Sequence, residues 1–564
     1  MSPSPAADTD ADVVAWHWWE PILIFAIGLS LLCALIVFYD NVHRATTNGL
    51  WKSIPMRLWV EHRTERYTDP GNLLYYPVLG RLLRLMPAEI FGPVWRRLAY
   101  VNAGCGAGVL ALTYLIALRL FRSRSTAFVA CLVQGAMGFF LLLSTINEDI
   151  MPGYVWFVAA LACAVVPRQF TAPVIMLTAQ CVALSWLFHS SLQLPGIGAF
   201  CVGILFWSGS IRAAASPIAL FVAALVPLPI LSALRFGLPW SEGLWAGKGL
   251  GTGWAGFSLN KIILMWSGIA QALVGGENVP GLDVIFVRSY VVVATLSWIV
   301  LLAVGVCWLS TARRARAAAE WRLATGVLAA VFLLGEGMNL YIQPQDPQMQ
   351  IQPMTWVPFA AACVYWSAPR LAPFQSAWLR GGLVAASLLL AGINVNRYTP
   401  FRHADSVAQA NVRATASLAP RERTVFLLHG FEGMNSWLTA EWGAGTDSPT
   451  PGSPDIGHFN AIYVGTEATE YPNRSPEDAV TSVVSLVDQA LDRGFDVVAG
   501  DIWTQPEEAW VDAFATISTP EKPIAIRNAL HAQFAGTKIG EVPGWTSLYR
   551  LTRKRATAVA EGAE

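Results

Sequence analysis

The sequence predicts an α-helical membrane protein with about eleven transmembrane helices and a C-terminal α/β domain. Its 564 residues are 54% hydrophobic and only 13% charged, whereas soluble domains carry about 25% charged residues. The mean hydropathy is +0.45, and long apolar runs fill residues 21–396. The 24 tryptophans fit the aromatic belts that line the two membrane interfaces. Residues 397–564 are more polar and show strand and helix patterns, so we expect a separate domain there.

A transmembrane helix needs about 20 consecutive apolar residues. The first run follows a polar, acidic tail, residues 1–20, which has neither a basic segment nor a cleavage site. We therefore expect a retained first span and not a removed signal peptide. Glycine and proline within the runs do not argue against spanning. The candidate spans are residues 21–39, 98–120, 126–145, 151–166, 171–188, 190–209, 214–236, 289–309, 323–341, 353–368 and 379–396.

Basic residues in the short loops predict that the N-terminus is cytoplasmic, because short cytoplasmic loops are rich in Lys and Arg. With that orientation one face of the membrane receives Arg122, Arg124, Arg168, Arg212, Arg313, Arg314, Arg316, Arg322 and Arg370. The outer face receives residues 40–97, 146–150, 237–288, 342–352 and everything after 396. Loop 40–97 is also rich in arginine, but long loops follow the rule poorly. We expect a plasma (inner) membrane protein whose C-terminal domain is extracytoplasmic.

Two long outer loops, 40–97 and 237–288, contain apolar stretches of their own. In residues 76–86, leucines and Met86 alternate with Arg81 and Arg84 at helical spacing. This pattern is typical of an amphipathic helix that lies in the membrane interface. Residues 262–274 predict a second interfacial or re-entrant helix.

The C-terminal domain alternates short apolar runs with a helical pattern, which is typical of a small α/β unit. Buried strands are predicted at 424–428, 461–464 and 496–499, and a last edge strand at 547–551. A helix is predicted at 476–493, because proline stands near its start and Gly494 follows its end.

Ionisable residues at the outer ends of the spans are the candidate site. A charged group within a membrane segment is costly and is a functional candidate by default. Asp40 directly follows the first span, and Glu336 lies near the outer end of the span 323–341. The further candidates on this face are Asp69, Glu148, Asp149, His189, Lys248, Arg288 and Asp346.

Most of these candidates have a structural alternative. Asp40 could simply end a helix in water, and Asp69 could form a turn before a proline. Glu148 and Asp149 could complement a helix dipole. His189 and Arg288 could sit at the membrane interface as anchors, and Lys248 lies in a glycine-rich loop that could close over a site.

Composition and motifs argue against several other classes of protein. The net charge is zero, which gives no support for nucleic-acid binding. The chain has no GxGxxG motif, no P-loop and no GxSxG nucleophile elbow. All eight cysteines lie in apolar segments without metal-type spacing, so no metal site is assigned to them.

Four short stretches carry a resemblance to a known superfamily. They are the acidic Asp40 after the first span, the string Asp69-Pro70-Gly71-Asn72-Leu73-Leu74-Tyr75 followed by Gly80-Arg81-Leu82, the string Asn147-Glu148-Asp149-Ile150-Met151-Pro152-Gly153-Tyr154, and Asp346-Pro347 followed by Pro353. Together with the layout of residues 20–370, they resemble the GT-C glycosyltransferases, and most closely the bacterial mannosyltransferase-like members with an extracytoplasmic C-terminal domain.

The resemblance implies an inverting glycosyltransferase that moves a sugar from a polyprenyl-phosphate donor to an acceptor hydroxyl on a polysaccharide, lipid or protein. It implies that Asp40 is the catalytic base. It assigns substrate contacts to Asp69, Tyr75, Glu148, Asp149, His189, Lys248, Arg288, Glu336 and Asp346. No cofactor is required, although a divalent metal near Glu148 or Asp149 is left open. A transporter or flippase of a lipid-linked sugar, and a non-catalytic membrane scaffold, are the alternatives.

Overall fold

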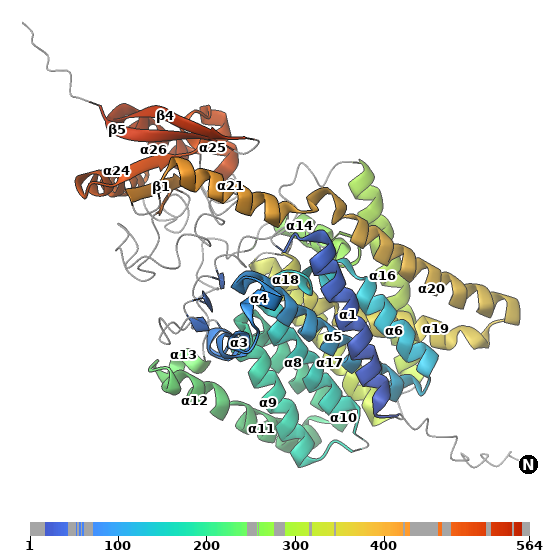
Figure 1. Cartoon of the computed structure of the whole chain (residues 1–564). Coiled ribbons are helices and arrows are strands. Elements are labelled where there is room, and N and C mark those ends of the chain that lie inside the picture. The colour runs from blue at the N-terminus through green and yellow to red at the C-terminus, as the bar shows by residue number, and fades with distance from the viewer. Residues whose placement is uncertain are drawn as a thin grey trace, which may run out of the picture. The chain divides into compact units, whose positions relative to one another are not determined.

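The protein is described by a computed structural model (Figure 1). The described residues are 17–42, 52–53, 56–57, 59–60, 72–167, 169–244, 257, 259–275, 288–314, 318–342, 344, 346–420, 423–428, 461–464, 475–514, 520–543 and 546–554. They fall into two compact units. The first comprises the described parts of Met1–Ala45, Arg66–Leu250 and Ala255–Arg402, and the second comprises those of Thr46–Glu65 and His403–Glu564.

The first unit is helical throughout its described residues. Its helices are α1 (Trp19–Tyr39), α3 (Tyr75–Arg84), α4 (Ala88–Phe91), α5 (Val94–Phe121), α6 (Arg124–Ala136), α7 (Gly138–Leu143), α8 (Ile150–Val165), α9 (Ala172–Phe188), α10 (Gln193–Ser208), α11 (Ile211–Leu225), α12 (Pro227–Arg235), α13 (Trp240–Leu244), α14 (Leu259–Leu273), α16 (Arg288–Arg314), α17 (Ala319–Tyr341), α18 (Pro347–Ile351), α19 (Val357–Ser367) and α20 (Pro373–Asn396).

Every predicted span falls on helix, and the protein is a multi-pass membrane protein. Among the described residues, seven helical stretches are long and apolar enough to cross a membrane: Trp19–Tyr39, Val94–Phe121, Ser190–Ser208, Ile211–Arg235, Val291–Arg314, Ala319–Tyr341 and Pro373–Leu418. Three shorter apolar helices accompany them, at Ile150–Val165, Ala172–Phe188 and Lys261–Leu273. The count of about eleven spans therefore stays a prediction. The predicted span 126–145 is interrupted at Met137, whose backbone is extended (φ −65°, ψ 135°).

Small residues let the helices pack closely. In a membrane the hydrophobic effect does not drive helices together, so their association depends on such close contacts. A Cβ atom on Gly326 of α17 would lie 2.9 Å from the Cα atom of Gly203 on α10. On α5, a Cβ atom at Gly106 would lie 2.5 Å from the hydroxyl of Ser144. These contacts fix α5 and α17, the two long helices that carry Arg96 and Glu336.

The predicted amphipathic helix is confirmed as α3. Leu79 and Leu83 are buried while Arg81 is exposed, and Arg97 of α5 donates to the carbonyls of Leu83 and Met86 at 2.9 and 3.0 Å. The predicted apolar helix at 262–274 corresponds to α14. That either helix lies in the membrane interface stays a prediction.

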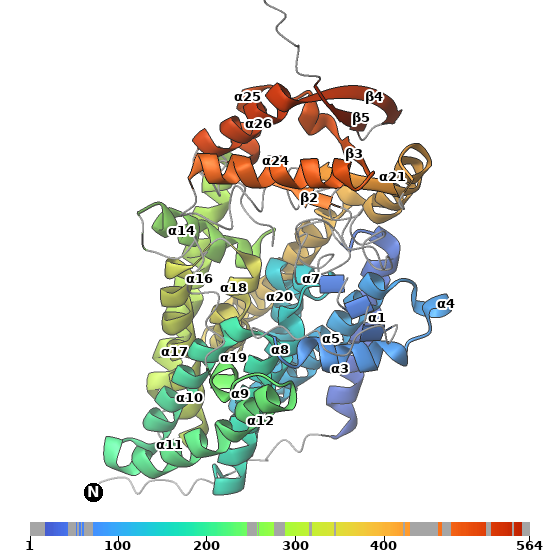
Figure 2. The same cartoon turned by 90° about the vertical axis from the view of Figure 1, so that its left-hand side faces the viewer.

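The second unit contains a five-stranded sheet (Figure 2). Its elements are α21 (Ala404–Leu418), β1 (Thr424–Leu428), β2 (Ala461–Tyr463), α24 (Pro476–Asp492), β3 (Asp496–Ala499), α25 (Glu507–Phe514), α26 (Glu521–Gln533), β4 (Phe534–Val542) and β5 (Thr546–Arg553). The strand order is β2-β1-β3-β5-β4. Strands β1, β2 and β3 are parallel, and β5 is antiparallel to both β3 and β4.

The predicted strands and helix of this unit are confirmed, with one correction. Helix α24 begins after Ser475, whose hydroxyl accepts from the Asp478 backbone N–H at 3.1 Å, and Gly494 follows it at φ +80°. The prediction that 547–551 forms an edge strand is wrong. Strand β4, which the sequence analysis missed, pairs antiparallel with β5 and forms the edge of the sheet.

Candidate active site

Helix α1 ends at Asp40 in an unusual backbone conformation. The residue has φ 48° and ψ 52°, in the left-handed region, and its N–H closes the helix onto the Ile36 carbonyl at 3.1 Å. Only a minority of non-glycine residues adopt this region, aspartate among the more tolerant. The turn buries the carboxylate, whose side chain is 8% exposed, against the guanidinium of Arg96. Arg96 stands in the first turn of α5, so the ion pair joins the end of one span to the start of the next.

The residues on either side of Asp40 are both fastened to Tyr398, which follows α20. The Tyr39 ring packs edge-on at 5.4 Å from the Tyr398 ring, and the Asn41 amide donates to the Tyr398 carbonyl at 3.3 Å. The Tyr398 hydroxyl lies 3.3 Å from that of Thr145. The segment that carries Asp40 is therefore held in place from both sides.

Glu148 lies at the start of α8 and is fully buried. The Gln348 side chain of α18 donates a hydrogen bond to its carboxylate. Asn102 of α5 donates to the backbone carbonyls of Ile146 and Glu148 at 2.7 and 2.5 Å. Asp346 acts as the N-cap of α18, since its carboxylate accepts from the Gln348 backbone N–H at 2.9 Å. Two predicted residues, Glu148 and Asp346, thus meet on Gln348.

Asp149 and His189 form a second pair in the same region. The Oδ1 atom of Asp149 lies 3.3 Å from Nε2 of His189, and the Ser191 hydroxyl lies 2.6 Å from Nδ1 of the same ring. Both the aspartate and the histidine are buried. A cluster that combines a carboxylate, an imidazole and a hydroxyl can donate and accept hydrogen bonds toward a polar ligand.

Tyr75, the first residue of α3, is buried close to both carboxylates. Burial raises the pKa of its hydroxyl well above the ordinary value, and the negative charges of Asp149 and Glu148 raise it further. Tyr75 therefore remains a protonated hydrogen-bond donor at neutral pH. The start of α3 is held in place by Leu74, whose N–H donates to the Leu187 carbonyl at 3.0 Å.

Glu336 lies near the end of α17 and is also held by α18. The Gln350 amide donates to its carboxylate at 3.2 Å and to the Pro344 carbonyl at 2.8 Å. The Asn339 amide donates to the Met349 carbonyl at 2.9 Å. Within the described part of the chain, one side-chain oxygen of each of Glu336, Asn339 and Gln350 is buried with no hydrogen-bond partner. This cluster therefore offers acceptors to a ligand rich in donors.

Six predicted residues contact one another or α18: Tyr75, Glu148, Asp149, His189, Glu336 and Asp346. Asp40 is linked to them through α5, because Arg96 of α5 pairs with Asp40 and Asn102 of α5 holds the backbone at Glu148. Asp69 and Lys248 lie outside the described residues. Arg288 begins α16, but its side chain lies outside the description. Among the described residues, no three His, Cys, Asp or Glu side chains are grouped as they would be to hold a metal ion.

Sequence reasoning missed Arg96 and Gln348, which contact candidate carboxylates, and Asn102, which holds the backbone at Glu148. Gln348, Gln350 and Gln352 alternate in an outer loop. That spacing could have identified Gln348, because amide side chains in a loop between apolar spans need hydrogen-bond partners. Arg96 and Asn102 gave a weaker one, because they stand in an otherwise apolar helix.

An apolar groove of about 750 Å³ runs beside this site, between α1, α3, α4, α5 and α8. Its lining includes Phe25, Leu29 and Cys33 of α1, at one-turn spacing, and Gly104 and Tyr100 of α5. Tyr100 is four residues from Arg96, so the two side chains share one face of α5. A second apolar groove of about 600 Å³ lies between α1, α6 and α20 and includes Gly135.

The architecture is similar to that of solved membrane glycosyltransferases. A crystal structure of ArnT from Cupriavidus metallidurans bound to undecaprenyl phosphate aligns with a TM-score of 0.52 at 11% identity, covering 95% of this chain and 98% of that one. The apo structure of ArnT from the same organism aligns with a TM-score of 0.53 at 12% identity, covering 94% and 97%.

No family model matches the chain, and no curated protein matches it. At this level of identity the alignment with ArnT, a GT-C glycosyltransferase, concerns the fold, and it extends over nearly the whole length of both proteins. The chain therefore has the GT-C-like fold that its sequence predicts.

Proposed function

We propose that the protein is an inverting glycosyltransferase that moves a sugar from a polyprenyl-phosphate donor to an acceptor hydroxyl on the outer face of the membrane. The observation that carries this proposal is the buried Asp40–Arg96 pair at the end of the first span of a GT-C-like fold. The ArnT structure bound to undecaprenyl phosphate supports a polyprenyl-phosphate ligand.

The proposed chemistry uses Asp40 as the general base. Its carboxylate takes the proton from the acceptor hydroxyl while the acceptor oxygen forms a bond to the anomeric carbon of the sugar. The bond between that carbon and the phosphate oxygen breaks on the opposite side, and the lipid leaves as polyprenyl phosphate. The Arg96 guanidinium pairs with the Asp40 carboxylate and holds it at the end of α1.

The apolar groove beside α1 is the proposed site for the polyprenyl tail. It reaches Tyr100, and from there one helical turn leads to Arg96 and Asp40. A tail in this groove would bring its phosphate to the polar end of the helices. Arg288 and Lys248 are proposed to bind the phosphate, because charge-assisted hydrogen bonds to phosphate are strong.

The remaining polar residues are proposed to bind and orient the sugar and the acceptor. They are Tyr75, Glu148, Asp149, His189, Glu336 and Asp346, with Asp69 proposed to belong to the same site. Aligning both substrates and excluding water is a large part of catalysis by such an enzyme. Burial of Tyr75, Glu148, Asp149, His189 and Glu336 gives the water-poor surroundings that this requires.

We further propose a cytoplasmic tail at residues 1–20, a catalytic membrane domain at 21–396 and an extracytoplasmic domain at 397–564 in the inner membrane. The arginines that the sequence places on one face support this orientation. The C-terminal domain would guide the acceptor.

The test is to incubate the purified full-length protein with a panel of polyprenyl-phosphate sugars and candidate acceptors. We expect one donor to raise the melting temperature and to be converted to polyprenyl phosphate, with the acceptor gaining the mass of the sugar. Movement of a lipid-linked sugar across vesicles without loss of the sugar would instead establish a flippase. No response to any donor would favour a scaffold.

A further inference from the structure

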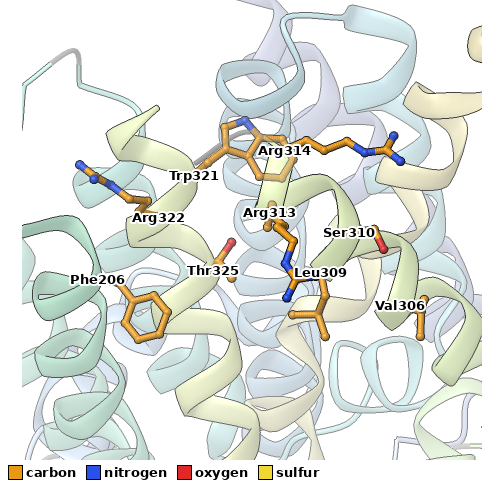
Figure 3. Close-up of a pocket in the computed structure, with 10 residues that line it drawn as sticks. Phe206, Val306, Leu309, Ser310, Arg313, Arg314, Trp321, Arg322 and Thr325 are labelled. Atoms are coloured by element: carbon orange, nitrogen blue, oxygen red, sulfur yellow. The ribbon is translucent and has the colours of Figure 1, made fainter. Parts of the chain in front are cut away.

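A further pocket lies where α16 ends and α17 begins (Figure 3). Glu336 lies near the other end of α17. The pocket has a volume of about 850 Å³ and lies between α10, α16 and α17. Its polar lining consists of Arg313 and Arg314 at the end of α16, Arg322 and Thr325 in the first turns of α17, and Ser310. Arg322 and Glu336 are fourteen residues apart on one helix, which is about 21 Å at 1.5 Å per residue. This pocket is therefore separate from the candidate active site.

The pocket is positively charged and holds unused hydrogen-bonding groups. None of its ten described lining residues carries a carboxylate. The Nε atom of Arg322 and the hydroxyl of Thr325 are buried and have no hydrogen-bond partner among the described residues. In Figure 3 the Arg313 side chain runs between Thr325 and Leu309. The guanidinium groups that line the pocket are hydrogen-bond donors with positive charge, so the site favours a ligand that brings anionic acceptor oxygens.

The remaining walls are apolar and lead into the membrane. Val306 and Leu309 of α16 line the pocket and are 64% and 58% exposed. Leu302, one turn before Val306, is 61% exposed and continues the same apolar face toward the middle of the span. A ligand that fits both halves of the site has an anionic head and hydrocarbon chains.

We propose that this pocket binds the phosphate headgroup of an anionic phospholipid, whose acyl chains lie along the exposed face of α16. Anchoring of a helix at the membrane interface would not require the arginines to line a common pocket. Here three of them line one pocket together with hydroxyl groups. Basic pockets between transmembrane helices on the cytoplasmic side commonly bind anionic headgroups, and the arginine distribution predicts that this end is cytoplasmic.

The proposal is tested by native mass spectrometry and thermal shift on the full-length protein in detergent. The probes are dioleoyl phosphatidylglycerol, dioleoyl phosphatidylcholine and inorganic phosphate. We expect phosphatidylglycerol to be retained and to raise the melting temperature, while the other two have no effect. Each of Arg313→Gln and Arg322→Gln should weaken retention about fivefold, since one basic residue near a membrane surface contributes about that factor.

Two further variants make the result interpretable. Arg212→Gln removes an exposed arginine at the start of α11 that does not line the pocket, and it should leave retention unchanged. Arg313→Lys with Arg322→Lys keeps both charges and should retain most of the binding if the glutamine variants lose it through charge and not through misfolding. Equal retention of the two lipids, or unchanged retention in both glutamine variants, would overturn the proposal. Stabilisation by inorganic phosphate alone would overturn the lipid as the source of the headgroup.

Discussion

The two ends of α1 each carry a buried carboxylate paired with an arginine, and the two pairs differ in instructive ways. Glu20 lies in the first turn, where the helix dipole favours a negative charge. Its carboxylate receives Arg124 Nε at 2.7 Å and the Tyr114 hydroxyl at 3.0 Å. Asp40 lies at the carboxyl end, where the dipole disfavours a negative charge; its left-handed backbone caps the helix, and its carboxylate pairs with Arg96.

The difference indicates that Glu20 is explained by local structure and Asp40 is not. Backbone conformations that are sparsely populated cost free energy and gather at functional sites. Local rules are broken most often where function requires it. We therefore assign stability to the Glu20 pair and chemistry to the Asp40 pair, and the Asp40→Asn, Glu20→Gln and Tyr114→Phe variants test that division.

The largest effect is expected for Asp40→Asn. Loss of a general base typically lowers the rate by about 10²–10⁴-fold, and the amide is nearly the same size as the carboxylate. Sugar transfer should fall by that factor while the melting temperature in detergent changes little. The matched control is Glu20→Gln, which also breaks a buried pair on α1. It should lower the melting temperature and leave the rate of the folded fraction unchanged; a comparable loss of rate in both variants would refute the division.

The next effect is expected for Gln348→Leu. This change removes a donor from the buried carboxylate of Glu148, and hydrogen bonds to charged groups contribute about 1.5–3 kcal/mol. Gln180→Leu is the control, because Gln180 donates to a neutral carbonyl, that of Ala224. Urea or thermal unfolding should show the greater loss of stability for Gln348→Leu. Equal losses would indicate that Glu148 does not depend on α18.

A larger side chain in the groove beside α1 and α5 tests whether that groove binds the polyprenyl tail. Gly104 lines the groove beside α1 and α5, and a Cβ atom there would meet nothing within 4 Å. Gly104→Leu should therefore fill the groove without disturbing α5 and raise the KM for the polyprenyl donor by about tenfold, a difference of about 1.4 kcal/mol. Gly135→Leu, which points toward the second groove, should leave that KM unchanged. The reverse result would move the lipid to the groove between α1, α6 and α20.

The smallest effect is expected for Tyr114→Phe. It removes the hydroxyl that donates to Glu20 and leaves Arg124 in place. The free energy of unfolding should fall by about 1.5 kcal/mol, the low end for a hydrogen bond to a charged group, because Arg124 still pairs with Glu20. Sugar transfer should not change. A loss of transfer would mean that the Glu20 end of α1 also takes part in function.

Much of the fold could be predicted because its signals are local. Every predicted span, located by its apolar run, falls on helix, and a proline and a glycine marked the two ends of α24. Strand β4 was missed because its sequence, rich in glycine and charge, lacks a clear alternation, and its pairing with β5 places β5 inside the sheet.

The candidate site could be predicted only in part. Costly carboxylates such as Asp40 and Glu336 stand out in an apolar chain. Their partners do not, because Arg96 and Gln348 are distant in sequence and are recognised only by contact. Which carboxylates meet on α18 depends on how helices pack, and packing cannot be read from a single span.

Asp40 as the base of an inverting transfer can be tested by following the anomeric proton of the sugar by NMR during turnover, with the wild-type protein, Glu20→Gln and Asp40→Asn side by side. In the first two samples we expect the donor signal to disappear and a product signal of opposite anomeric configuration to replace it, while the donor persists in the third. A product that retains the donor's configuration would rule out inversion, and a product formed at the same rate by Asp40→Asn would rule out Asp40 as the base.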